Sequence, residues 1–539
     1  MSRSLRLRRW QKEALDALAA SPSPNFLAVA TPGAGKTTFA LTAVVTDLAA
    51  HPHRRVVIVA PTAHLKTQWA SAAANFGLHL EPDWQPVGGW PHDFHGVVVT
   101  YQQVASDPRA IRAFTDDAIV VLDEVHHAGA ERAWGDGIET AFTPASRRLS
   151  LSGTPFRSDQ NPIPFVEYAF DEAVADYTYG YGEALQEGGV VRPVFFPRFD
   201  GHMEWSTPEG DIVSATFGDN LDRAHQSQRL RTALSLEGEW LPTVLANAHD
   251  QLARLRQSDP TSGGLVIAMD VDHARGIADL LKRRHGVTAI VATSDDPMAS
   301  EKIADFAASR DPWIVAVRMV SEGVDIPRLR VAVYATNTVT ELFFRQAVGR
   351  VVRWTPGQRR QKAFFFIPDD IRIRFFATDL AAQRTHSLRR READGEQPPV
   401  ELDQVSADPG DQMSLFQAIS ATALDGDGVS GVFDDSHPED LIHEEEAAGF
   451  ELQLPPPPPR AAANGATAVA TTVPLTQQRK ELRQANADRV QLLVHLTGLS
   501  HGEVNAKLNA SSSVRSVEQA TLKELQARLR EADRWLEKV

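Results

Sequence analysis

The 539-residue sequence contains no cysteine. This absence excludes a disulfide scaffold, a thiolate zinc site and a cysteine nucleophile. The sequence also lacks an apolar run of the roughly 18 residues that a membrane-spanning helix requires. Its N-terminal stretch is basic and has no apolar core of the kind that secretory signals contain. We therefore expect a cytoplasmic protein with no membrane partner, long enough for roughly three to five folded units.

The sequence also has fewer basic than acidic residues. It contains 55 lysines and arginines and 70 aspartates and glutamates, which gives a net charge of -15. The excess of acidic residues is confined to one region. Between Arg391 and Leu452 there are 17 acidic residues and one basic residue, and the rest of the chain is close to neutral. The net charge therefore does not exclude a nucleic-acid partner.

The acidic region belongs to a longer segment, 386–474, that is poor in large apolar residues and includes five consecutive prolines from Pro455. A segment that buries so little surface cannot offset the entropy lost on ordering, so we predict a largely disordered linker. Its short apolar stretches, such as the one that starts at Met413, can still dock on a folded domain.

Short β-branched and apolar runs recur through the first 370 residues, with helical patterns between several of them. This alternation is typical of a parallel sheet whose strands are joined by crossover helices. The first block has such runs at 26–30, 56–60, 96–100, 119–123 and 147–153, and the second block at 264–269, 313–317, 331–336 and 363–368. The sequence therefore predicts the α/β class, with two domains of similar plan.

A glycine-rich loop joins the first predicted strand to a helix. Gly33 and Gly35 allow backbone N–H groups to approach phosphate oxygens at a helix N-terminus, where the helix dipole also favours anions. Lys36 would reach the β- and γ-phosphates, and the Thr37 hydroxyl would bind Mg²⁺. The strict pattern begins with glycine where this chain has Ala30, so an ordinary strand-to-helix turn is the alternative. The predicted nucleotide contacts of this loop are Thr31, Pro32, Gly33, Ala34, Gly35, Lys36, Thr37 and Thr38.

Two adjacent carboxylates follow another predicted strand. Asp123 and Glu124 stand at the carboxyl end of a strand that such a sheet brings beside the phosphate loop. Asp123 is suited to hold Mg²⁺, and Glu124 to orient and deprotonate an attacking water. A solvent-exposed acidic turn is the alternative, and the apolar run before the pair argues against it. We predict no metal site at the neighbouring His126 and His127, which point apart on an extended chain and lack an evident third ligand.

With these motifs the sequence resembles the superfamily 2 helicases and translocases that carry a DEVH box, in the style of the XPB-like and restriction-motor branches. The resemblance covers residues 5–370, with the motifs in the family's order. It implies two tandem RecA-like parallel-sheet domains that hold ATP and Mg²⁺ in the cleft between them. The expected boundaries are 1–200 for the first RecA-like domain, 201–260 for a helical connecting segment, 261–385 for the second RecA-like domain, 386–474 for the acidic linker and 475–539 for a small helical module.

The resemblance also assigns roles outside the loop and the carboxylate pair. Gln11 matches the family's adenine-reading glutamine, and the segment 321–327 matches its fifth motif, in which Gly323 and Asp325 are nucleotide contacts. His126, the histidine of the DEVH box, matches the residue that couples the two domains, and Ser152 and Thr154 lie in the segment that couples the nucleotide state to the grip on nucleic acid.

The most specific match is the family's QxxGRxxR motif, here formed by Gln346, Gly349, Arg350 and Arg353. The two arginines are three residues apart and share a face if the segment is helical. Guanidinium groups suit a transferring phosphoryl group, whose charge is spread over several oxygens. Because the arginines belong to the second domain and Lys36 and Glu124 to the first, ATP would close the cleft and hydrolysis would reopen it. An arginine pair that anchors a surface helix is the alternative.

Candidate contacts to nucleic acid follow from the same resemblance. Thr62, Thr100 and Ser321 lie in motifs that track the polymer backbone, and Thr293 and Thr336 are further candidates near strand ends. Hydroxyl and N–H groups can contact phosphates without a large positive charge. Each of these residues is equally suited to cap a helix.

Two other regions leave alternatives open. Tyr177, Tyr179 and Tyr181 alternate as on a strand, which favours packing against the domain over stacking on bases. The C-terminal tail shows helical leucine spacing and capping-box patterns at Ser500 and Ser516, so we predict three helices. This module is either a plain small bundle or a docking site for DNA or a protein partner.

We therefore predict an ATP hydrolase coupled to translocation on nucleic acid or its unwinding. The DEVH box at 123–126 and the SGTP segment at 152–155 resemble those of DNA translocases, a resemblance that favours DNA over RNA. Two other hypotheses stay open. One is a motor subunit of a defence, restriction or repair complex that holds partner proteins through the acidic linker or the helical module. The other is a nucleotide-gated clamp without unwinding, against which the intact Lys36, Glu124 and Arg353 argue.

Overall fold

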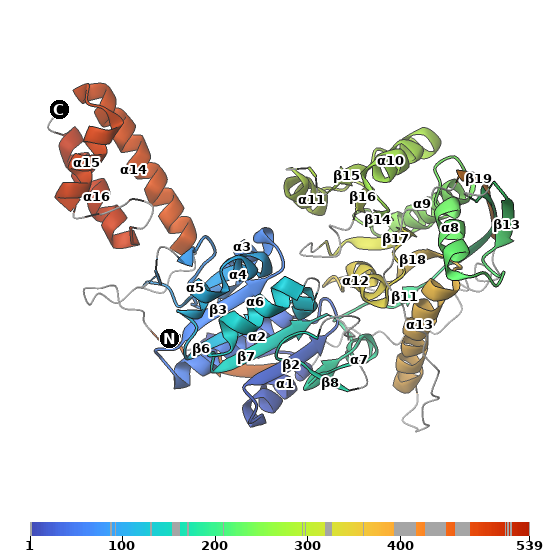
Figure 1. The fold of residues 1–539 in the computed structure, drawn as a ribbon, viewed down its shortest axis with the longest axis horizontal. Coiled ribbons are helices and arrows are strands. Elements are labelled where there is room, and N and C mark those ends of the chain that lie inside the picture. The colour runs from blue at the N-terminus through green and yellow to red at the C-terminus, as the bar shows by residue number, and fades with distance from the viewer. Residues whose placement is uncertain are drawn as a thin grey trace.

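Figure 1 shows the computed structural model, in which two α/β units lie side by side and a three-helix unit extends from the first of them. The described residues are 3–86, 89–91, 93–129, 132–153, 162–169, 172–207, 210–293, 295–296, 298–317, 326–358, 361–392, 417–425, 449–458, 475–512, 514, 517 and 520–537. None of the helices in these ranges has the length and apolar character needed to span a lipid bilayer.

The first α/β unit is built on a seven-stranded parallel sheet in the order β10-β2-β7-β6-β3-β5-β4. In that order the strands are Tyr177–Tyr179, Asn25–Ala30, Arg147–Ser152, Ala118–Leu122, Arg55–Ala60, Gly96–Thr100 and Leu80–Glu81. Its helices are α1 (Arg9–Ala20), α2 (Lys36–Ala50), α3 (Ala63–Ala74), α4 (Tyr101–Ser106), α5 (Pro108–Arg112), the 3₁₀ helix η2 (Val125–Gly129), α6 (Arg132–Phe142) and α7 (Tyr181–Glu187). The central strands are almost wholly buried, as a parallel sheet between helical layers requires.

The second α/β unit contains a nine-stranded sheet whose main path is β13-β12-β18-β17-β14-β16-β15. In that order the strands are Ile212–Thr216, Arg198–Ser206, Ala363–Pro368, Leu329–Ala335, Gly263–Ala268, Trp313–Val317 and Ile290–Ala292. Two more strands join it, β11 (Val194–Phe195) beside β18 and β19 (Gln417–Asp425) beside β12. The helices are α8 (Arg223–Ala233), α9 (Trp240–Ser258), α10 (Val271–His285), α11 (Ala299–Ala308), α12 (Glu341–Val351) and α13 (Ile371–Glu392). The predicted α/β class with two largely parallel sheets is confirmed.

Residues 201–260, which we expected to form a helical connection, contain the helices α8 and α9 but also β13 and most of β12, which belong to the second sheet. Strand β12 alternates buried side chains with partly exposed ones, and α9 begins with Trp240, whose indole N–H donates to the carbonyl of Asp200 at 3.0 Å. The alternation in 198–206 is the period-two pattern of a half-buried strand. It could have been found in the sequence, but the helical patterns that follow it obscured it.

The tyrosine series is divided between two elements. Tyr177 and Tyr179 lie in β10 and stack on Trp10, with ring centroids 6.4 and 5.3 Å apart. Tyr181 starts α7, where its hydroxyl donates to the carbonyl of Arg192. These rings therefore pack inside the unit.

Two parts of the acidic segment form strands. Besides β19 on the second sheet, β20 (Phe450–Leu454) pairs antiparallel with β1 (Arg3–Leu7) at the start of the chain. The prolines after β20 lie against the first unit, where His95 Nε2 is 3.0 Å from the carbonyl of Pro458. The segment predicted as a linker thus contacts both α/β units, while its residues 393–416, 426–448 and 459–474 lie outside the described ones.

The C-terminal unit consists of α14 (Leu475–Thr497), α15 (His501–Ser512) and α16 (Leu522–Leu536). Its core is formed by Val490, Leu493, Val504, Leu508 and Ala532. Ser500 forms the predicted capping box with Glu503. Helix α16 is capped by Thr521 and Glu524, and Ser516 lies outside the described residues.

Helix α14 is attached to the first unit through Arg479. This guanidinium donates to Glu81 Oε2 at 2.7 Å and to both oxygens of Asp93 at 2.9 and 3.0 Å, and lies over the ring of Phe94. Arg479 and Glu81 are both buried. Burial raises the pKa of Glu81, an effect that Arg479 partly offsets. The ion pair is therefore a buried link between the three-helix unit and the edge of the first sheet.

We expect Arg479→Ala to weaken this attachment by about 3–5 kcal/mol, because it leaves Glu81 buried without its cation. The measurement is the opening free energy of amides in β4 and β5 by hydrogen exchange on the full chain. Arg489→Ala is the matched control, because the Arg489–Asp533 pair is 39% and 46% exposed and should contribute no more than about 1 kcal/mol. Equal effects of the two substitutions would contradict the buried link.

Candidate active site

The loop between β2 and α2 has the backbone of a phosphate-binding loop. Gly33 and Gly35 have φ values of +84° and +92°, in the left-handed region that glycine adopts without strain. Helix α2 begins at Lys36 directly after them. Lys36 Nζ lies 2.9 Å from Glu124 Oε1 and 3.4 Å from the carbonyl oxygen of Ala30.

Three side chains at the start of α1 hold the carbonyls of this loop. Arg8 Nη1 donates to the carbonyls of Gly33 and Ala34, Trp10 Nε1 to that of Ala34, and Gln11 Nε2 to that of Gly35, at 2.8–3.0 Å. Because the C=O and N–H of one peptide point in opposite directions, this anchoring turns the N–H groups of Gly35 and Lys36 away from α1. Gln11 was predicted as a site residue, whereas Arg8 and Trp10 were not.

The carboxylate pair stands at the end of β6, as predicted. Asp123 Oδ2 accepts from the indole N–H of Trp69 at 2.8 Å, and its carbonyl accepts from the Tyr101 hydroxyl at 2.9 Å. Glu124 has a φ of +46°, a conformation that costs a residue other than glycine about 1–3 kcal/mol. Lys36 and the N–H of Gly153, which donates to Glu124 Oε2 at 3.0 Å, hold Glu124 there.

The two carboxyl groups ionise unequally. Burial and the neighbouring charge of Glu124 raise the pKa of Asp123 to about 6. Burial acts in the same direction on Glu124, but Lys36 and the N–H of Gly153 favour its charged form more strongly, so its pKa falls to about 2. Glu124 is therefore ionised beside Lys36, while Asp123 is a buried carboxyl that a cation would stabilise in its charged form.

His126 links the first unit to α12 of the second. Its Nε2 lies 3.0 Å from Nε2 of Gln346, and its Nδ1 lies 3.5 Å from Ser152 Oγ and 3.7 Å from Glu124 Oε2. With the Gln346 amide donating, His126 Nε2 is the acceptor, which places the ring proton on Nδ1. The predicted coupling residues His126 and Ser152 thus come together, and Thr154 lies outside the described residues.

Helix α12 packs directly on the phosphate loop. A Cβ built on Gly349 would lie 2.5 Å from Cγ of Pro32 and 2.7 Å from its Cβ, so only glycine fits there. A Cβ on Gly33 would lie 3.5 Å from Cγ of Arg353. Burial lowers the pKa of Arg353 to about 10, which leaves it a cation at neutral pH.

The two motif arginines do not share a helix face. Helix α12 ends at Val351, and Arg353 follows in an antiparallel bridge with Val191. Arg350 is in the last turn of the helix. The condition for a shared face, a helix that includes both arginines, is therefore not met, because the chain turns into the bridge after Val352.

The structure describes some of the remaining predicted site residues and not others. Thr37 and Thr38 lie in the first turn of α2. Thr100 caps α4, since its hydroxyl accepts from the N–H of Gln103, whereas Thr62 occupies the cap position of α3 without such a bond. Ser321, Gly323 and Asp325 lie outside the described residues.

Comparison with known proteins identifies the family of this chain. The model of the family described as "Type III restriction enzyme, res subunit" matches residues 4–157. An uncharacterized protein of Mycobacterium tuberculosis is 39% identical, over 97% of this chain and 92% of its own, and one of Mycobacterium leprae is 38% identical, over 97% and 93%. The DNA 3'-5' translocase XPB2 of Sulfurisphaera tokodaii is 25% identical over 65% of this chain and 79% of its own. The chain belongs to the superfamily 2 helicases and translocases, in one family with the two mycobacterial proteins.

Among solved structures, a fragment of a putative HsdR subunit of a type I restriction enzyme from Vibrio vulnificus aligns with a TM-score of 0.48 at 17% identity. The alignment covers 68% of this chain and 65% of that one.

We expect Gly349→Ala to separate α12 from the phosphate loop, because its methyl group would overlap Pro32. The ATP hydrolysis that the sequence predicts should fall at least about tenfold, which corresponds to about 1.4 kcal/mol of barrier, while the circular dichroism spectrum stays unchanged. Gly502→Ala in α15 is the control, since its Cβ would meet nothing closer than 3.9 Å. Wild-type hydrolysis by the Gly349 variant would show that the contact is not needed.

Proposed function

We propose that the protein is an ATP-driven motor on nucleic acid that hydrolyses ATP where its two α/β units meet, with DNA favoured over RNA. The observation that carries the proposal is the contact of the second unit with the phosphate loop of the first. Lys36, which follows this loop, pairs with Glu124 at 2.9 Å, and Cγ of Arg353 in the second unit lies 3.5 Å from the position that a Cβ on Gly33 would take. A site divided between two units makes hydrolysis depend on their relative position.

The residues present fit ATP with Mg²⁺. The N–H groups of Gly35 and Lys36 face away from α1 at the N-terminus of a helix, where phosphate oxygens bind favourably. Thr37 and the buried Asp123 would hold Mg²⁺, which supplies charge neutralisation of the phosphates. The raised pKa of Asp123 is consistent with a carboxyl that ionises fully against a cation.

In the proposed reaction Glu124 accepts a proton from the water that attacks the γ-phosphorus, as ADP departs. Lys36 moves from Glu124 to the phosphates, and Arg353 stabilises the charge on the transferring group. His126 and Gln346 then carry the change to the second unit through their contact at 3.0 Å. Gly323 and Asp325 belong to this proposal on the basis of the family motif alone.

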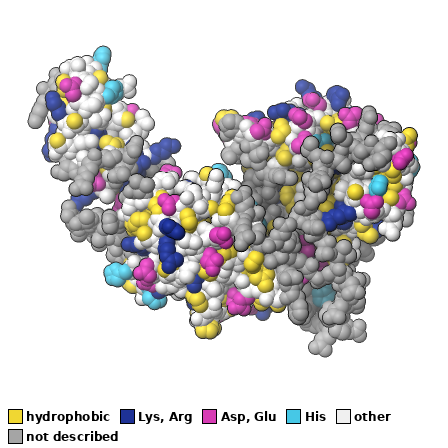
Figure 2. All heavy atoms as spheres, viewed as in Figure 1, with side chains coloured by type: hydrophobic (Ala, Val, Ile, Leu, Met, Phe, Trp, Pro, Cys, Tyr) yellow, Lys and Arg dark blue, Asp and Glu magenta, His cyan; other side chains and the backbone are white. Residues whose placement is uncertain are grey.

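Nucleic acid is proposed to lie along the face where the carboxyl ends of β3 and β5 meet α3 and α4, near Thr62 and Thr100. Ser321 belongs to this proposal on the basis of its motif alone. Figure 2 shows the surface hollowed between the three-helix unit and the second α/β unit, with the first unit as its floor. The similarity to a DNA translocase supports DNA as the polymer.

A second candidate function is that of a motor subunit in a restriction or defence assembly. The observation that favours it is the match of residues 4–157 to a family of restriction-enzyme subunits. Co-purification of a defined nuclease or methyltransferase with the full chain would support this candidate.

We expect DNA to stimulate ATP hydrolysis and Glu124→Gln to lower the rate by about 10²–10⁴-fold, because the variant lacks the base. The rate should be measured without polymer and with single-stranded, duplex and forked DNA and RNA, together with ATP binding, which the variant should retain. Glu139→Gln, on the exposed side of α6, is the isosteric control. A rate indifferent to every polymer would count against the motor, and an active Glu124 variant against the assigned base.

A further inference from the structure

The chain passes from the first unit to the second through residues 190–194, and this crossing segment is bonded to the stretch that follows α12. Val191 forms an antiparallel bridge with Arg353. On its two sides the N–H of Arg192 donates to the carbonyl of Val352 at 2.7 Å, and the N–H of Trp354 to that of Val190 at 3.4 Å. The crossing segment and Arg353 therefore share one short ladder of backbone hydrogen bonds.

The side chain of Arg192 is fully buried, with an exposed fraction of 0%, and adds hydrogen bonds to this ladder. Its Nη2 donates to the carbonyl of Pro327 at 2.8 Å, to Thr355 Oγ1 at 3.1 Å and to the carbonyl of Arg353 itself, and its Nη1 donates to the carbonyl of Leu329 at 3.3 Å. One guanidinium thus joins the crossing segment, the end of the 321–327 motif and the residue that approaches the phosphate loop.

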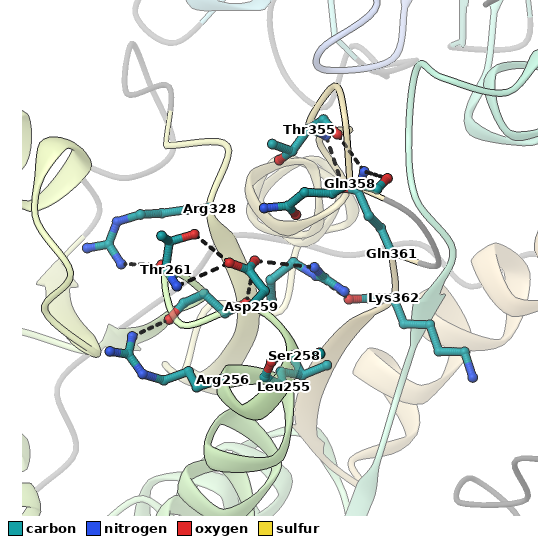
Figure 3. A network of polar contacts seen from close by, with 12 residues as sticks. Leu255, Arg256, Ser258, Asp259, Thr261, Arg328, Thr355, Gln358, Gln361 and Lys362 are labelled. Atoms are coloured by element: carbon teal, nitrogen blue, oxygen red, sulfur yellow. Dashed lines mark hydrogen bonds and ion pairs between the residues drawn. The ribbon is translucent and has the colours of Figure 1, made fainter. Parts of the chain in front are cut away.

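The loop after Arg353 is also held by Gln361 at its other end, as Figure 3 shows. Gln361 accepts from the N–H of Thr355 at 3.0 Å and donates to the carbonyls of Thr355 and Gln358 at 2.6 and 3.0 Å. Gln361 therefore fixes the internal shape of the loop, and Arg192 fixes the loop to the crossing segment.

The crossing segment also reaches the phosphate loop. A Cβ on Gly33 would meet Cγ of Arg353 at 3.5 Å and the carbonyl oxygen of Val190 at 4.0 Å. We propose that Arg192 is a positioning residue, which makes Arg353 move with the crossing segment and so sets where its guanidinium lies over the phosphate loop. This inference rests on the proposed ATP hydrolysis, to which Arg192 contributes through Arg353 and without touching the nucleotide.

The test compares Arg192→Lys with wild-type full-length protein. A lysine keeps the charge but lacks the planar fork that reaches four acceptors in two segments, 327–329 and 353–355. We expect the kcat for ATP to fall about tenfold or more, with KM for ATP changed less than about twofold, because an arginine that acts on the transferring group affects the transition state. In the Arg353→Ala background, Arg192→Lys should cause no further loss, since its effect passes through Arg353.

Arg328→Lys is the matched control. Arg328 likewise donates to backbone carbonyls of separate segments in the second unit, those of Phe306, Thr261 and Asp311, and has no hydrogen bond to the stretch 352–355 (Figure 3). Its substitution should leave kcat within about twofold of wild type.

Hydrogen exchange gives a readout that needs no ATP hydrolysis. The amides of 352–355 should exchange faster in the Arg192→Lys protein and at the wild-type rate in the Arg328→Lys protein. Unchanged exchange at 352–355, or losses that add fully in the double variant, would overturn the positioning role. Absence of ATP hydrolysis in the wild-type protein would instead refute the proposed function, and the exchange result would still decide whether Arg192 positions Arg353.

Discussion

The arrangement of the site depends on the close approach of helix α12 to the phosphate loop. Gly349 has no Cβ, and Pro32 occupies the space that a Cβ would need. Because of this approach the Arg353 side chain lies over Gly33 and Gln346 reaches His126. Such a contact is sensitive to distance, since a gap of about 0.5–1 Å already forfeits a quarter to a half of the dispersion energy. A small rotation between the units is therefore enough to make or break the site.

The charges inside the site are likewise arranged so that the basicity of Glu124 can differ between two states. Lys36 lies on Glu124 and keeps its pKa at about 2, which makes Glu124 a weak base. A general base works best when its pKa lies near the working pH. In the proposed cycle, phosphates that draw Lys36 away would remove the cation that lowers this pKa. Glu124 would then become more basic only when its substrate is bound.

The sequence predicted the parts of the molecule that depend on local pattern. Strands such as β2, β3 and β6 are runs of β-branched and apolar residues, because parallel strands bury both faces. The loop glycines and the carboxylate pair were found because phosphate and metal chemistry allow few residue types at those positions. Among the predicted residues that the structure describes, Gln11 bonds to the phosphate loop, and His126 lies beside Ser152 and Glu124.

Other features could not be predicted, because they depend on contacts between distant parts of the chain. Arg8, Trp69 and Arg192 belong to no motif, and each acts on a partner at least 25 residues away. Strands β19 and β20 are short segments inside an acidic region, and they form because β12 and β1 offer edges for pairing. Arg353 is displaced from the face of α12 by a bridge to Val191, a residue more than 150 positions earlier.

Two stretches of the chain connect the two α/β units. One runs from Asp425 in β19 to Phe450 in β20, and its residues 426–448 lie outside the described ones. The other is the crossing segment 190–194, whose backbone is hydrogen-bonded directly to 352–354. The buried side chain of Arg192 adds to this connection. In the proposed motor, movement of one unit relative to the other must therefore reach Arg353 through the crossing segment.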